Sequence, residues 1–240
     1  MIAAITFDFW NTLYRPAYAG PWRMRRLIET LENNGLGVEP DRLAAADQVA
    51  RDEWNRAWIE DYRTLSSADW LQIMFGAVQV QLPASEFETL AHHFDRGLLE
   101  DKPGPTLVTG AADLLHRLAP RYRLGMISDA GLSSGQTLRD VLRRDDIFHY
   151  FDCLTYSDEI GVSKPHARAF TTTLACLEAV AANTVHIGDL TRTDIAGAKS
   201  IGLRTVRFAE IYDDPDRSVE PDAVVYSLVE FEKWLLDQTN

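Results

Sequence analysis

The sequence predicts an α/β fold, a doubly wound parallel sheet with an inserted α-helical domain. Three observations lead to this prediction. Residues 3–7 form a short apolar run with β-branched and aromatic members, which is typical of a buried strand. Beyond residue 105, short apolar runs alternate with helical patterns, the arrangement of parallel sheets with right-handed crossovers. Between these two parts, residues 16–100 show helical patterns and no convincing strand.

The inserted segment reads as a small helical bundle with short connections. We therefore expect one domain made of residues 1–15 and 101–240, and a second, helical domain made of residues 16–100. The pair Trp54 and Trp58, spaced i and i+4, is predicted to belong to the bundle core. The expected helices cover residues 22–32, 40–62, 67–80 and 84–98.

The remainder of the chain supplies the other strands and the helices that cover the sheet. A lone first strand cannot stand with a helical bundle, so residues 3–7 must join this sheet. The expected strands are 122–127, 153–156, 184–187, 203–208 and 223–226, and the expected helices are 111–118, 136–144, 167–181, 193–201 and 228–236.

Charge and hydropathy exclude several classes of partner. The net charge of −12 disfavours nucleic acid and anionic membranes as partners. No apolar run approaches the roughly 20 residues of a membrane span, and the first residues lack a basic segment. We expect a cytoplasmic protein. Cys153 and Cys176 form no C-x-x-C pair, so neither a disulfide nor a structural zinc site is expected.

Polar side chains follow several predicted strands where each strand ends. These are Asp8, Ser128, Lys164 in the loop before an Ala-rich helix, Asp189, and Asp194 five residues later. Each has a simpler explanation as a turn, loop or cap residue. Parallel strands, however, present their carboxyl ends at one edge, where open α/β sheets bind ligands. The five together therefore predict an active site.

In these motifs the chain resembles the haloacid dehalogenase-like (HAD) hydrolase superfamily over nearly its whole length. That resemblance implies a Rossmann-like core and identifies the inserted helices as a cap domain. The matching motifs, in order, are Asp8 with Asn11-Thr12-Leu13, then Ser128, Lys164, and Gly188-Asp189 with Asp194.

The resemblance also implies roles for these residues. Asp8 is the expected nucleophile, forming an aspartyl-phosphate that divides one displacement into two steps. Ser128 is expected to donate a hydrogen bond to the phosphoryl group, and Lys164 to balance charge between Asp8 and the substrate. The expected reaction is phosphate release from a small phosphorylated metabolite.

The same resemblance implies a Mg²⁺ cofactor. Asp8 and Asp189 are the expected carboxylate ligands. The backbone carbonyl of Trp10 is expected to complete the protein ligands, and Asp194 to bind or support the ion.

Trp10 departs from the phosphatase pattern, in which a second Asp acts as general acid at this position. Indole cannot serve as a proton acid near neutral pH, and general acid–base catalysis is typically worth about 10²–10⁴-fold. We therefore expect alkyl phosphates to be poor substrates. Dehalogenases also carry an aromatic residue here, which keeps 2-haloacid dehalogenation open, although they lack the Gly188-Asp189 type of motif. A non-catalytic, ligand-binding member of the superfamily is a further alternative.

Two other patterns point elsewhere. Residues 131–135 match the G-x-S-x-G elbow of serine hydrolases, but Ser133 lies several residues beyond its strand and no histidine follows His186. The arginines at 23, 25 and 26 are read as a solvated helix face, with contact to an anionic substrate as the alternative.

Overall fold

A six-stranded parallel sheet organises the structure, a computed structural model that describes residues 1–238. Its strand order is β5-β4-β1-β6-β7-β8. The strands are β1 (Ala4–Phe7), β4 (Arg123–Ser128), β5 (Cys153–Tyr156), β6 (Thr184–Gly188), β7 (Arg204–Phe208) and β8 (Ala223–Val225). β1 is wholly buried and pairs with both β4 and β6, placing Ile5 beside Leu124 and Val185. The predicted fold class is confirmed.

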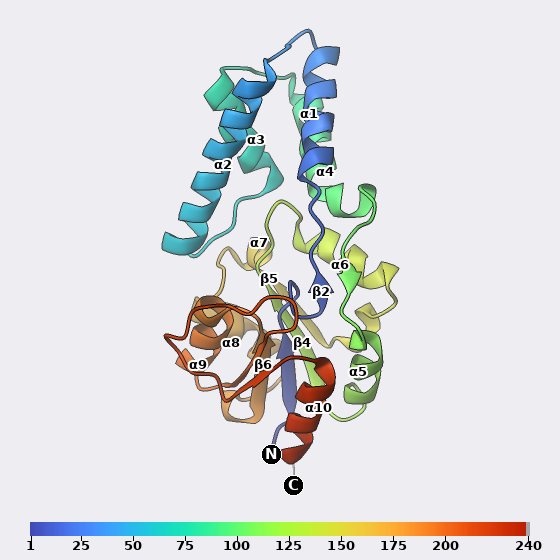
Figure 1. Ribbon diagram of the computed structural model, residues 1–240, viewed down its shortest axis with the longest axis vertical. Coiled ribbons are helices and arrows are strands. Elements are labelled where there is room, and N and C mark those ends of the chain that lie inside the picture. The colour runs from blue at the N-terminus through green and yellow to red at the C-terminus, as the bar shows by residue number, and fades with distance from the viewer. Residues whose placement is uncertain (239–240) are drawn as a thin grey trace.

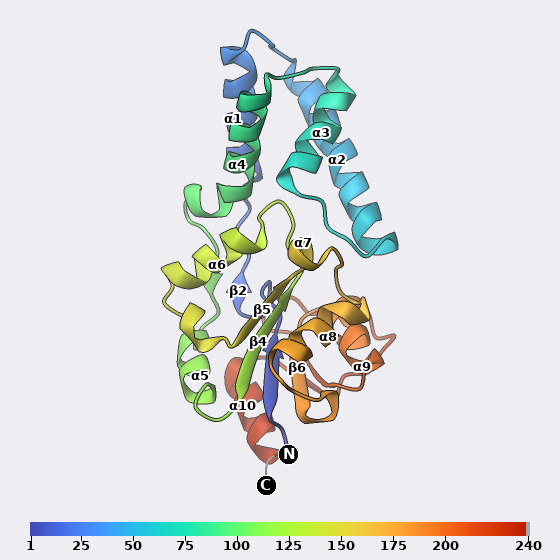
Figure 2. The same ribbon diagram turned by 180° about the vertical axis from the view of Figure 1, so that it is seen from behind.

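Helices cover both faces of this sheet (Figures 1 and 2). On one face lie α5 (Ala111–Leu118), α6 (Gly135–Arg144) and α10 (Leu228–Asp237), which pack on the largest apolar cluster. On the other lie α8 (Ala167–Cys176) and α9 (Ala196–Ser200). A short helix, α7 (Ser157–Ile160), follows β5 directly. None of the helices within residues 1–238 has the length and apolar character needed to span a membrane.

Four further helices lie beyond one end of the sheet, at the top of Figure 1, while both termini lie at the opposite end. They are α1 (Gly20–Asn33), α2 (Pro40–Glu60), α3 (Ser67–Val78) and α4 (Ala84–Glu100). Their apolar faces form a cluster of their own, which includes Leu27, Leu71, Met74 and Phe94. We call these four helices the cap.

The two segments that connect the cap to the sheet pair with each other. β2 (Tyr14–Arg15) and β3 (Thr106–Leu107) form an antiparallel ribbon, with Tyr14 opposite Leu107. No strand is predicted from the sequence for either segment, because two-residue strands have no readable alternation.

The two cysteines form a disulfide, so the prediction of no disulfide is wrong. Cys153 begins β5 and Cys176 ends α8, and their Cα atoms lie 6.0 Å apart. The predicted helix over 167–181 stops at Cys176, and the short helix of residues 181–183 follows a turn. Packing of α8 against β5 brings together two residues that are 23 positions apart, within the Cα distance that a disulfide can bridge.

Candidate active site

Asp8 follows β1 directly and is fixed by the neighbouring strand. Its backbone N–H donates to the carbonyl of Ile187 at 2.9 Å, and the residue is only 4% exposed. The Lys164 ammonium donates a hydrogen bond to the Asp8 carboxylate. The same ammonium donates to Oδ1 of Asp194 at 2.6 Å. One buried cation therefore joins carboxylates from two strand ends.

Asp189 and Asp194 both derive from the end of β6. Asp194 lies in a single π-helical turn, Thr191–Ile195, of the kind often found at functional sites. Its side chain turns back beneath the strand end, where a Cβ on Gly188 would come within 2.4 Å of the Asp194 carboxyl carbon. Only glycine therefore fits at position 188.

Hydrogen bonds occupy both oxygens of Asp194. His186 Nε2 lies 3.1 Å from Oδ1, which also accepts from Lys164, and the backbone N–H of Leu190 donates to Oδ2 at 3.1 Å. His186 is completely buried and is a supporting residue that the sequence analysis assigned no role. Its position two residues before Gly188 in a strand gave no signal beyond burial.

Asn11 connects the first and last motifs. Its φ of 54° lies in the left-handed region, which Asn adopts more readily than most residues. This conformation lets its amide donate to Oδ2 of Asp189 at 3.0 Å. Asp189 is thereby oriented toward the end of β1.

The side chains of the site are buried and carry more negative than positive charge. Burial raises the pKa of Asp8, and Asp194 and Asp189 raise it further against the opposing effect of Lys164. Burial and Asp194 raise the pKa of Asp189 to about 7. Burial alone would raise the pKa of Asp194, but Lys164 and His186 hold it below its usual range. Asp194 is thus the carboxylate whose charge the protein itself balances.

The other two carboxylates suit a hard divalent cation. Asp8, Asp189 and the backbone carbonyl of Trp10 offer only oxygen donors, which Mg²⁺ prefers while it retains several waters. A dication would also offset the charge that raises the pKa of Asp8 and Asp189. Among residues 1–238, no cluster of three or more His, Cys, Asp or Glu side chains forms a ready-made metal site. A divalent cation held here would therefore take its protein ligands from two carboxylate side chains and one backbone carbonyl.

Ser128 lies at the end of β4, next to the end of β1. It is 1% exposed, and its hydroxyl has no hydrogen-bond partner in the described structure. The hydroxyls of Thr12 and Ser163 are likewise buried and unpartnered. Buried polar groups normally have partners, so these three hydroxyls, all within the motif segments, provide unused hydrogen-bonding capacity.

A small cavity of about 130 Å³ lies at these strand ends, and we call it the inner chamber. Four predicted site residues and Trp10 line it. The predicted residues are Asp8, Lys164, Asp189 and Asp194; Ser128 is not among the lining residues.

The cap closes this chamber with aromatic side chains. Trp54 and Trp58 of α2 stack with ring centroids 5.5 Å apart, and both line the inner chamber. The prediction that both are cap-core residues is therefore wrong for Trp58 and incomplete for Trp54, which also packs on the cap cluster. Trp58 Nε1 donates to Oδ2 of Asp129 at 2.8 Å, and the Arg192 guanidinium lies 4.1 Å from its ring.

Asp129 is a chamber residue that the sequence analysis left out, although it directly follows Ser128 at a strand end. Burial raises the pKa of its carboxyl, while Lys164 and the hydrogen bond from Trp58 oppose that shift. The carboxylate thus accepts from a cap residue and from the backbone N–H of Lys164, at 2.9 Å.

Arg23 and Ser133 join the cap to the sheet domain. Arg23 is buried and donates to the hydroxyl of Ser133 at 3.0 Å, which itself donates to the carbonyl of Asp95 at 2.7 Å. The expectation of a solvated arginine face is wrong for Arg23, because it points into the boundary between the two parts. Ser133 serves as a contact residue there, in agreement with rejection of the serine-hydrolase elbow.

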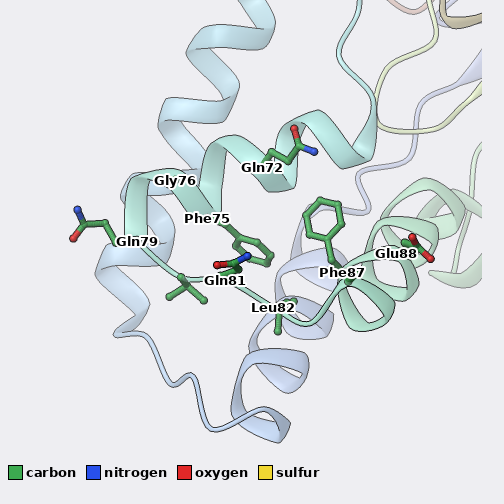
Figure 3. A pocket seen from close by; sticks show the side chains of 10 residues that line it. Gln72, Phe75, Gly76, Gln79, Gln81, Leu82, Phe87 and Glu88 are labelled. Atoms are coloured by element: carbon green, nitrogen blue, oxygen red, sulfur yellow. The ribbon is translucent and has the colours of Figure 1, made fainter.

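A larger cavity, of about 620 Å³, lies at the far end of the cap (Figure 3). Phe75 of α3 and Phe87 of α4 project into it, together with Leu82 from the connecting loop. All its lining residues fall within 72–88, so no strand-end residue contacts it. It is separate from the candidate site.

Comparison with known proteins gives a family. A family model for haloacid dehalogenase-like hydrolases matches residues 2–202. The chain is 28% identical over 191 residues to pyrimidine 5′-nucleotidase YjjG of Escherichia coli, covering 73% of this chain and 81% of the relative. It is 27% identical over 232 residues to glyceraldehyde 3-phosphate phosphatase of Methanocaldococcus jannaschii, covering 96% and 95%.

Solved structures show the same fold. The crystal structure of 2-haloacid dehalogenase from Pseudomonas syringae superimposes with a TM-score of 0.75 at 24% identity, covering 99% of this chain and all of that one. A HAD phosphatase from Thermococcus onnurineus superimposes with a TM-score of 0.63 at 21% identity, covering 98% of each. Proteins named for both chemistries therefore share the fold.

Proposed function

This chain belongs to the haloacid dehalogenase-like hydrolases, and on that basis we propose that it is a Mg²⁺-dependent phosphatase of small phosphorylated metabolites. One observation carries the proposal. Lys164 binds Asp8 and Asp194 at once, and Asp189 lines the same 130 Å³ chamber. A lone carboxylate substrate would meet four fixed carboxylates there, those of Asp8, Asp129, Asp189 and Asp194. A phosphoryl group bridged by a cation would instead be stabilised.

The proposed mechanism begins at the carboxylate of Asp8. One of its oxygens attacks phosphorus, the bond from phosphorus to the leaving oxygen breaks, and an aspartyl-phosphate forms. Lys164 opposes the burial that raises the pKa of Asp8 and contributes positive charge beside the transferred group. A water then attacks the phosphorus, which releases phosphate and restores Asp8.

The remaining residues of the site position this chemistry. Asp8, Asp189 and the carbonyl of Trp10 would hold Mg²⁺, which when bound polarises phosphoryl oxygens. Asp194 holds Lys164 in place, and the unpartnered hydroxyl of Ser128 is the proposed donor to the phosphoryl group. The relatives named as a nucleotidase and as glyceraldehyde 3-phosphate phosphatases support phosphate esters as the substrate class.

The test is a substrate panel assayed with and without Mg²⁺. It contains acetyl, p-nitrophenyl and alkyl phosphates together with 2-haloacids. We expect phosphate release that depends on Mg²⁺, with alkyl phosphates slowest because Trp10 cannot donate a proton. Asp8→Asn, nearly identical in shape, should remain folded and lose turnover. Loss of general acid–base catalysis alone typically costs more than about tenfold in rate. A variant that keeps a rate within about tenfold of wild type would therefore exclude Asp8 as the nucleophile.

One observation favours a second candidate, 2-haloacid dehalogenation. Halide leaves without a proton, so Trp10 at the general-acid position is no obstacle to it. In the same panel this activity would appear as halide release independent of Mg²⁺, and it would replace the phosphatase proposal.

A further inference from the structure

A second, larger cavity is lined by residues of both the cap and the sheet domain and shares lining residues with the inner chamber. This outer chamber has a volume of about 480 Å³. Of the described residues, Trp10 and Trp54 are the two that line both cavities. Both indoles therefore border the space next to a phosphoryl group in the inner chamber. The outer chamber is otherwise lined largely by aromatic and apolar side chains, among them Tyr18, Trp70, Leu98 and Leu132.

Both indoles are held in place by their neighbours. The Trp10 ring packs edge-on against Phe9 at 4.6 Å, and Phe9 stacks on Tyr14 at 4.4 Å. Trp54 stacks on Trp58, which is bonded to Asp129. Rigid aromatic surfaces of this kind bind flat rings with little loss of side-chain freedom.

A glycine, Gly131, lies opposite Trp54. A Cβ on Gly131 would already touch the Trp54 ring at 3.6 Å. Any longer side chain at position 131 would compete with the indole for this space. The ring therefore lies against the loop that follows β4, directly above the strand ends.

We propose that the leaving group is an aromatic ring bonded directly to the phosphate oxygen, so that the substrates are aryl phosphate monoesters. This inference rests on the proposed phosphatase function and specifies its substrate class. Two independent observations support it. The indoles of Trp10 and Trp54 border both chambers, and the general-acid position is occupied by Trp10, which cannot donate a proton. A phenolate leaves with the electron pair of the broken P–O bond and takes its proton later from water, so it needs no general acid.

The test compares two substrates whose leaving groups both depart unprotonated, phenyl phosphate and acetyl phosphate. Only the first carries a ring. We expect Trp54→Leu to lower kcat/KM for phenyl phosphate about tenfold more than for acetyl phosphate, in the range that stacking on an aromatic side chain contributes. Trp54→Phe, which retains a ring, should recover most of the loss. Val49→Ala, at an exposed position of the same helix that lines neither chamber, is the matched control.

A binding measurement separates this inference from the proposed function. Calorimetry with Mg²⁺ compares phenylphosphonate with methylphosphonate, which cannot be hydrolysed and differ by the ring. Tighter binding of phenylphosphonate, lost in Trp54→Leu, supports the ring site. If acetyl phosphate is hydrolysed but both phosphonates bind equally well, the ring site is overturned and the phosphatase function is retained. The same conclusion follows if Trp54→Leu lowers kcat/KM equally for both substrates. Absence of phosphate release from every ester overturns the phosphatase and the substrate class with it.

Discussion

At the scale of single residues, the site separates two kinds of carboxylate. Asp194 is fully hydrogen-bonded within the protein, and its pKa lies below the usual range. Asp189 accepts from the amide of Asn11 and has no cation bonded to it among the contacts described, and its pKa is raised to about 7. A carboxylate left short of positive charge is the one expected to bind a cation from solution.

This difference predicts the behaviour of Asp189→Ala. We expect Mg²⁺ affinity to fall by at least about tenfold, the lower end of the loss from disturbing a metal site, and excess Mg²⁺ to restore part of the rate. Titration of Mg²⁺ by calorimetry and by phosphate release measures both effects. Glu29→Ala, which removes an exposed carboxylate of α1, is the control. Unchanged Mg²⁺ affinity in Asp189→Ala would make Asp189 a structural residue.

The sequence could reveal the strand-end residues for a simple reason. Parallel strands end at one edge, so Asp8 and Asp189 had to lie close together once β1 and β6 were identified. Trp58 and Arg23 could not be assigned in this way, because their partners, Asp129 and Ser133, lie 71 and 110 residues away. Helical spacing tells which side of α2 faces inward, but not that this side extends beyond the cap core to the active site.

At the scale of elements, most helices and all strands of the sheet were predictable, because each helix carries an apolar period and each strand a short apolar run. The end of α8 was not predictable, because the apolar residues after Cys176 continue the helical pattern although the helix ends at Cys176. There Glu178 adopts a φ of 51°, which ends the helix and turns the chain toward β6. The cysteine spacing did not show how α8 packs on β5.

The disulfide between these two elements predicts a measurable stabilisation. A link between cysteines 23 residues apart is expected to contribute about 3 kcal/mol, chiefly by restricting the unfolded chain. Cys176→Ser should lower the free energy of unfolding by about that amount, as measured by denaturant titration. Dithiothreitol should produce a similar loss in the wild type and none in the variant. Thr172→Ser, at an exposed position of α8, is the control; equal stability of Cys176→Ser and wild type would show that the link is not formed in solution.

At the scale of the whole molecule, the cap and the sheet domain have separate apolar clusters. The β2–β3 ribbon connects them, and hydrogen bonds cross the boundary from Trp58 to Asp129, from Arg23 to Ser133, and from the Ser67 hydroxyl to the carbonyl of Leu132. Polar contacts of this kind can exchange with water at modest net cost. The predicted division into two domains would therefore have a mechanical consequence. The aromatic roof of the inner chamber belongs to the cap, which is the part that would move.

We therefore predict that the cap acts as a lid over the phosphoryl site. Residues 15–20 and 102–105 are the expected hinges, since they connect the β2–β3 ribbon with α1 and α4 and contain Pro16, Gly20 and Gly104. Mg²⁺ with beryllofluoride, which mimics a phosphoryl group on Asp8, should slow hydrogen exchange in both segments and reduce the radius of gyration measured by X-ray scattering. Asp8→Asn should show neither response, because it lacks the carboxylate that the mimic requires. If the wild type responds no more than Asp8→Asn, closure is not coupled to the phosphoryl site, and the indoles of α2 form a fixed roof over a chamber that substrates enter from the side.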